Sequence, residues 1–156
     1  MGRRMTLKQA DLEFMLVERA IEREVVRFAR AMDERDWDTI RKIMLPDATA
    51  RLADQDLKGP EEVIEKIHSF LDRCGPTQHL VGNVLVSISP DGASASSRAY
   101  INDRHVGKGD RSGLIYATLG EYFDKWEKHD GAWRMRHRTK DNRARTGTLE
   151  VFGLPS

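Results

Sequence analysis

Apolar side chains recur at steps of three and four between about residues 7 and 35, while the charged residues of this segment lie away from them. This spacing places the apolar side chains in one stripe along a long amphipathic helix. We expect the stripe to pack against a large partner, for which a β-sheet is the simplest choice. The stripe consists of Ala10, Phe14, Val17, Ile21, Val25, Phe28 and Met32.

Two shorter helices are predicted next. Asp36 is a suitable N-cap for the first, which Pro46 ends. The Gly-Pro-Glu-Glu run at 59–62 begins the second, because proline fits a first turn and acidic side chains suit its positive end. Residues 48–53 have a weak strand pattern. His68 lies off the apolar side of its helix, so we expect it on the surface.

From His79 onward the pattern alternates with a period of two, which is typical of strands. Gly120, inside one of these runs, indicates a bulge or bend. Three helices followed by an antiparallel meander predict an α+β domain, in which the helices pack into one face of a curled sheet and leave a cavity. The strand runs cover about residues 80–89, 93–106, 114–128 and 132–143.

Composition narrows the class of protein. The 156 residues suffice for one domain, with 1–6 as a flexible N-terminus and 146–156 as a C-terminal tail. A net charge of +1 gives no reason to expect nucleic acid as a partner. Cys74 is the only cysteine, so we expect no internal disulfide and no metal site, and no apolar run is long enough for a membrane span. These features predict a soluble, cytoplasmic protein.

The candidate chemistry lies at His79, which follows a helix-ending run at 74–76 and opens the first long strand. An imidazole has an ordinary pKa of roughly 6.5 and exchanges protons near neutrality, so this histidine is a candidate base. Asp33 borders the apolar stripe in the last turn of the long helix, where the helix dipole disfavours a negative charge, and it therefore needs a partner. The alternatives are a structural or solvated histidine and a frayed helix end with a solvated aspartate.

Three segments resemble the SnoaL-like family: 32–38 (MDERDWD), 77–79 (TQH) and 122–133 (YFDKWEKHDGAW). The resemblance spans roughly residues 20–138. It implies the cystatin-like cone, a curved and mainly antiparallel sheet wrapped around N-terminal helices with an internal pocket. Scytalone dehydratase, bile-acid dehydratase and hexachlorocyclohexane dehydrochlorinase share that fold. It also implies a homo-oligomer, with a trimer ahead of a dimer.

The resemblance implies roles for three residues. Asp33 matches the helix-end aspartate of the family, and His79 matches the histidine that takes a proton from substrate carbon. Asp103 resembles, more loosely, a pocket aspartate of the bile-acid enzyme or a second histidine of the scytalone enzyme, and its alternative is a solvated residue before a turn. The chain departs from those relatives where they carry tyrosines that polarise the substrate, because it has Phe28, Met32 and Leu52 at about those positions.

Further residues are candidates for contact with the substrate. A hydroxyl of Tyr116 or Tyr122 would assist the leaving group if it points inward. Trp133, Met135 and His137 share a parity on the last strand, so His137 either lines the pocket or packs as a structural residue. The other parity carries a basic run, which we interpret as a solvated face; a subunit interface or a site for an anionic handle of the substrate is the alternative. The run comprises Arg134, Arg136 and Arg138 and continues to Lys140, Arg143 and Arg145.

Together these features predict a cofactor-free lyase or isomerase that abstracts a proton from a small, apolar, cyclic substrate. A dehydratase-like β-elimination is favoured over isomerisation. One alternative is a noncatalytic ligand-binding or assembly module, and another is a polyketide cyclase. The apolar tail after Gly147 is expected to fold back over the cone or onto a neighbouring subunit.

Overall fold

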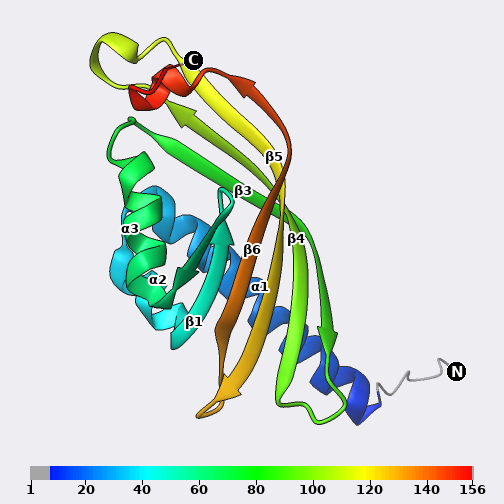
Figure 1. Ribbon diagram of the computed structural model, residues 1–156. Coiled ribbons are helices and arrows are strands. Elements are labelled where there is room, and N and C mark those ends of the chain that lie inside the picture. The colour runs from blue at the N-terminus through cyan, green and yellow to red at the C-terminus, as the bar shows by residue number, and fades with distance from the viewer. Residues whose placement is uncertain (1–7, 156) are drawn as a thin grey trace, which may run out of the picture.

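The computed structural model describes residues 8–155, in which helices pack on a mixed β-sheet (Figure 1). The predicted flexible segment 1–6 lies outside the described residues. The helices are α1 (Gln9–Glu34), α2 (Trp37–Ile43), α3 (Gly59–Leu71) and the 3₁₀ helices η1 (Gly109–Arg111) and η2 (Leu149–Phe152). The strands are β1 (Met44–Leu52), β2 (Gln55–Lys58), β3 (Thr77–Ile88), β4 (Ser94–Val106), β5 (Ile115–His129) and β6 (Ala132–Gly147).

The six strands form one sheet in the order β2-β1-β6-β5-β4-β3. β1 and β6 are parallel, and all other neighbours are antiparallel. The predicted α+β cone, with its curved and mainly antiparallel sheet around N-terminal helices, is confirmed. The short strand β2 was not predicted, because its four residues carry too little alternation to stand out from a turn.

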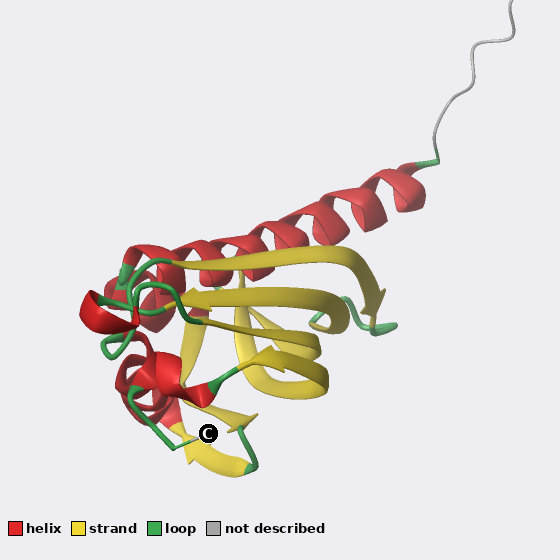
Figure 2. Cartoon of the chain, turned by 90° about the horizontal axis from the view of Figure 1, so that it is seen from above, coloured by secondary structure: helices red, strands yellow, loops and turns green. Residues whose placement is uncertain are grey.

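α1 crosses one face of the sheet and continues beyond its edge (Figure 2). Ile21, Val25, Phe28 and Met32 from the predicted stripe are buried in the core. Phe14 belongs to the same stripe but is 43% exposed, because the helix outruns the sheet there. No helix in the described part of the chain is long and apolar enough to cross a membrane.

The C-terminal end of α1 is fixed by Arg35, which has a left-handed backbone (φ 58°) and ends the helix. Its guanidinium donates to the carbonyl oxygens of Met32 (2.9 Å) and Leu71 (3.1 Å) and to Thr77 Oγ1 (2.9 Å). One side chain therefore joins the ends of α1 and α3 to the beginning of β3. This junction sets where Asp33 and His79 lie.

The register between β5 and β6 shifts twice, between Leu119 and Gly120 and between Lys125 and Trp126. The first shift confirms the bulge or bend predicted at Gly120. The second changes which side chains of β6 face inward: Met135 is opposite Trp126, whereas Arg138 is opposite Asp124. All four of these side chains are buried.

The C-terminal tail folds back over one end of the cone, as predicted. Val151 and Phe152 in η2 are 0% and 3% exposed. The Phe152 ring packs edge-on against Phe70 of α3, with 5.4 Å between centroids, and against His105 of β4, with 5.2 Å. The tail therefore joins α3 to the sheet.

Candidate active site

Asp33 and His79 are in direct contact. Asp33 Oδ1 lies 2.7 Å from His79 Nδ1, and Asp33 Oδ2 accepts the backbone N–H of His79 at 2.9 Å. Thr77 donates its hydroxyl to Oδ1 at 2.8 Å. The His79 side chain is 5% exposed and that of Asp33 is 19% exposed. The solvated and frayed alternatives are therefore wrong: the two residues form a shielded, hydrogen-bonded pair.

The electrostatics of the pair favour a charged carboxylate. Burial disfavours the charge on Asp33, but the hydrogen bonds from the His79 ring and backbone and from Thr77 outweigh burial and lower the pKa of Asp33. An ionised carboxylate accepts a hydrogen bond from Nδ1–H, which leaves Nε2 of a neutral imidazole as the free acceptor. No described residue forms a hydrogen bond with Nε2. This geometry suits a general base.

A second histidine, His105, packs edge-on against the His79 ring with 5.5 Å between centroids. Burial lowers the pKa of His105 to about 4, with the charge of Asp103 opposing. The ring is therefore neutral at physiological pH. Sequence reasoning missed His105, although it shares the inward parity of Asp103 on β4.

Asp103 lies opposite His79 in the β3–β4 register and is fully buried. Its carboxylate accepts hydrogen bonds from the Thr118 backbone (3.0 Å) and hydroxyl (2.7 Å) and pairs with Lys140. Burial would raise the pKa of Asp103, but the charge of Lys140 and these hydrogen bonds lower it. The solvated alternative is wrong for Asp103, and its catalytic role stays a prediction.

Arg138 corrects the interpretation of the basic run as a solvated face, because its side chain is only 2% exposed. It forms two hydrogen bonds with Asp124, of 2.8 and 2.7 Å. Its guanidinium carbon lies 4.3 Å from the Phe28 ring centroid and 3.8 Å from that of Tyr122, so the group is held between two rings. Among the described residues, Nη1 of Arg138 is buried without a hydrogen-bond partner. An orphaned buried donor points to a missing acceptor, such as a substrate atom.

Four of the predicted substrate-contact residues are buried. Phe28 is 1%, Met32 4%, Leu52 9% and Tyr122 3% exposed. Burial raises the pKa of Tyr122, the carboxylates of Asp33, Asp103 and Asp124 add to this, and Arg138 opposes it. Tyr122 therefore remains a neutral phenol. Tyr116 lies near the tail, with its ring 6.1 Å from that of His105.

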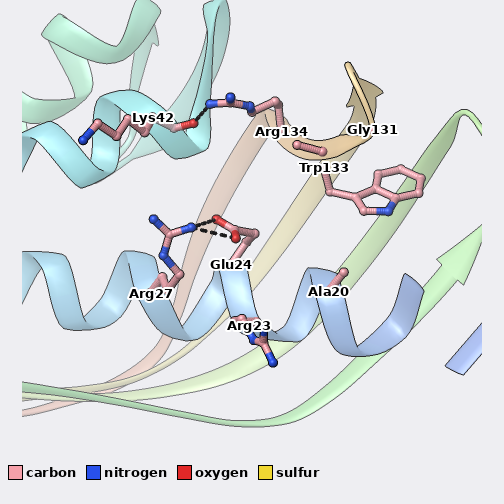
Figure 3. Close-up of a pocket in the computed structure, with 9 residues that line it drawn as sticks. Ala20, Arg23, Glu24, Arg27, Lys42, Gly131, Trp133 and Arg134 are labelled. Atoms are coloured by element: carbon pink, nitrogen blue, oxygen red, sulfur yellow. Dashed lines mark hydrogen bonds and ion pairs between the residues drawn. The ribbon is translucent and has the colours of Figure 1, made fainter. Parts of the chain in front are cut away.

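Two predicted pocket residues lie away from the Asp33–His79 pair. His137 is on the outer face, where Nδ1 is 2.7 Å from the hydroxyl of the exposed Thr49, because the second register shift reverses the parity of β6 after Met135. Trp133 is buried beside Ala20 of α1 (Figure 3). Ala20 and Asp33 are about 20 Å apart along a helix with a rise of 1.5 Å per residue. The prediction that Trp133 lines the site is wrong, and for His137 the structural alternative holds.

Two hollows of the described structure lie away from the pair. One, of about 390 Å³, lies between α1 and the β5–β6 turn, and the other, of about 350 Å³, lies beside the ends of β3, β4 and β5. The acid–base pair and the two hollows thus indicate different places for the functional site. We favour the pair, because a hydrogen-bonded acid and base define a reaction and a hollow alone does not. An internal pocket beside His79 stays a prediction.

The chain belongs to the SnoaL-like domain family, which matches residues 13–139. No curated protein matches it. Solved structures establish the fold independently. A proposed scytalone dehydratase from Novosphingobium aromaticivorans is 18% identical, with a TM-score of 0.76 over 86% of this chain and 89% of that chain. Hexachlorocyclohexane dehydrochlorinase LinA-type3 from Novosphingobium barchaimii is 16% identical, with a TM-score of 0.77 over 94% and 99%. A proposed aromatic ring hydroxylase from N. aromaticivorans is 24% identical, with a TM-score of 0.76 over 86% and 95%.

Proposed function

We propose that this protein is a cofactor-free lyase that uses the Asp33–His79 pair to remove a proton from a carbon atom of a small cyclic substrate. The observation that carries the proposal is the 2.7 Å contact between Asp33 and Nδ1 of His79, which leaves Nε2 free to accept a proton. Membership of the SnoaL-like domain family supports the proposal. So does the similarity of this fold to a proposed scytalone dehydratase and to a hexachlorocyclohexane dehydrochlorinase. A positioned base of this kind contributes typically about 10² to 10⁴ in rate.

In this mechanism Nε2 of His79 takes a proton from the carbon next to an electron-withdrawing group of the substrate. The C–H electron pair forms a carbon–carbon double bond, and the leaving group departs from the neighbouring carbon with its own electron pair. Asp33 stabilises the imidazolium that forms. For a dehydration, the leaving hydroxide takes a proton from the imidazolium or from the neutral Tyr122 phenol and leaves as water. A β-elimination of this kind is our preferred reaction, and a double-bond isomerisation shares its first step.

Arg138 supplies the donor that the carbonyl-polarising tyrosines supply in the resembling enzymes. Its unpartnered Nη1 would donate to a carbonyl oxygen or another acceptor of the substrate. Because Asp124, Phe28 and Tyr122 already hold the guanidinium, this donor is fixed before the substrate binds. The proposed substrate is therefore a small ring compound with an acceptor atom, in addition to its apolar body.

A noncatalytic binding module is the second candidate, and the position of both hollows away from the pair favours it. The two candidates differ in one respect: a lyase removes a proton from a carbon atom of the substrate, and a binding module does not. Cyclic β-hydroxy and β-halo carbonyl compounds would be incubated with the protein in deuterated water and followed by NMR for elimination or deuterium uptake. His79→Ala should abolish the reaction, and the matched variant of the exposed His68, His68→Ala, should retain it. A reaction that His79→Ala sustains at the native rate would refute the mechanism, and no reaction across the panel would favour the binding module.

A further inference from the structure

The N-terminal part of α1 extends beyond the edge of the sheet (Figure 2). It carries exposed apolar side chains. Leu12 is 41%, Phe14 43%, Met15 51% and Leu16 62% exposed. Leu12, Met15 and Leu16 are three and four residues apart, so they share one side of the helix and form a patch that water does not favour. A partner is expected to cover it. The acidic residues Asp11 and Glu13 lie in the same segment.

The second part of α1 lines a hollow of about 390 Å³ (Figure 3). Ala20, Arg23, Glu24 and Arg27 form one wall, and the opposite wall comes from Lys42 at the end of α2 and from residues 131–134. The only carboxylate of this lining is Glu24. Among the described residues, Arg23 and Lys42 make no ion pair. The hollow is therefore basic, whereas the projecting part of the same helix is acidic and apolar.

The spacing along α1 makes these two parts complementary. Glu13, Ala20 and Arg27 are seven residues apart, which is close to two helical turns, so they lie on one face. A second α1 that crosses antiparallel at Ala20 would place its Glu13 opposite Arg27. Leu16 is four residues before Ala20 and Glu24 four residues after it, so Leu16 of the second helix would enter the hollow beside Glu24.

We propose that this hollow is the seat for the N-terminal part of α1 from a second copy of this chain. The contact has two-fold symmetry, so each copy gives its acidic, apolar segment and receives its partner's. Ala20 is small enough for two helices to cross closely, and the apolar body of Trp133 forms the far wall of the hollow. Arg27 donates to Glu24 through Nη1 at 2.8 and 2.9 Å, which leaves Nε and Nη2 for the carboxylate of a second chain.

This surface is separate from the proposed reaction. Ala20 and Asp33 are about 20 Å apart along α1. A two-fold contact makes a dimer, so it is distinct from the trimer that the family resemblance implies. Both interfaces together would give larger assemblies with an even number of subunits.

Paired charge reversals test the contact. Glu13→Arg and Arg27→Glu each place like charges opposite one another twice in the dimer, so each variant alone should lose self-association through this surface. An equimolar mixture of the two variants should recover it, because both contacts then join an arginine to a glutamate. Sedimentation velocity at micromolar protein concentration would measure the mass, which should fall about twofold for each variant and rise again on mixing.

Two further variants keep the test decisive. Leu16→Asp removes the inserted apolar side chain and should lower the mass as the charge reversals do. Glu65→Arg, an equal charge reversal at an exposed site on α3, should leave the mass unchanged. Circular dichroism would verify that every variant is folded. A wild-type monomer, or Glu13→Arg and Arg27→Glu with native mass, or a mixture that does not recover the mass, would each overturn the proposal.

Discussion

Asp33 holds His79 at two points, since one carboxylate oxygen meets the ring at Nδ1 and the other accepts the backbone N–H. The pair joins the last turn of α1 to the beginning of β3. The backbone bond fixes the strand, and the ring bond fixes the orientation and tautomer of the imidazole. Removal of the charge on Asp33 should therefore affect chemistry more than fold.

Asp33→Asn should leave the fold intact and lower kcat by about 10² to 10⁴. The amide still offers one acceptor, but it cannot stabilise an imidazolium as a carboxylate does. Steady-state kinetics on a substrate found by the elimination screen would measure the loss, and nitrogen NMR of His79 would report the tautomer. Asp38→Asn, at an exposed carboxylate on α2, is the control and should keep native turnover. Native kcat in Asp33→Asn would show that the pair is structural.

Arg138→Met should destabilise the protein by about 3 to 5 kcal/mol, because it leaves the carboxylate of Asp124 buried without its counter-charge. Urea unfolding followed by circular dichroism would measure the change. The double variant Arg138→Met with Asp124→Leu should recover most of the lost stability, since it removes both charges, and it should still lack activity because the Nη1 donor is gone. Native activity in a folded double variant would exclude Arg138 from the reaction.

Periodicity predicted most helices and strands of this fold, because burial against one sheet face imposes a period of 3.6 on a helix and of two on a strand. The same reasoning failed where a strand register shifts and where a helix extends beyond the sheet. Period-two alternation on β6 places His137 inward and Arg138 outward, but the register shift at Trp126 reverses them. No glycine marks that shift, so the sequence carries no signal for it. Phe14 fits the buried stripe equally well, because a helix pattern does not show where the sheet ends.

The candidate site was likewise predicted only where local sequence position was enough. Asp33 and His79 were predicted because each occupies a position where its charge or proton exchange needs a partner, and the family resemblance joined the two. His105 was missed although the alternation on β4 places it inward with Asp103. The His105 ring packs against Phe152, which is 47 residues away in the sequence. Contacts of that range do not follow from a local pattern.

Lowering the pH should destabilise the protein, because the buried His105 resists protonation in the folded state. Its pKa is lowered to about 4 from an ordinary 6.5, so the unfolded chain binds the proton first as pH falls. The stabilising contribution is complete above pH 6.5 and is lost as pH falls from there through about 4, by at most about 3 kcal/mol. Asp33 acts in the same direction but only at lower pH, because its pKa is lowered from 3.8.

His105→Gln should therefore flatten the stability profile between pH 6.5 and 4. Urea unfolding at a series of pH values would show this as a smaller slope in the variant than in the wild type. His68→Gln, at an exposed histidine, should keep the native slope. Equal slopes in His105→Gln and the wild type would contradict the buried, neutral state of His105.

The tail should control both stability and the titration of His105. The Phe152 ring contacts Phe70, His105 and Tyr116 with centroid distances of 5.2 to 5.5 Å, so Phe152→Ala should destabilise the fold by about 3 to 5 kcal/mol. It should also admit water to His105 and raise the pKa of that histidine from about 4 toward 6.5. Urea unfolding would measure the first effect and proton NMR titration the second. Pro155→Ala, in the exposed end of the tail, is the control and should change neither. If Phe152→Ala lowers the stability but leaves the titration of His105 unchanged, the strand neighbours rather than the tail keep water from this ring.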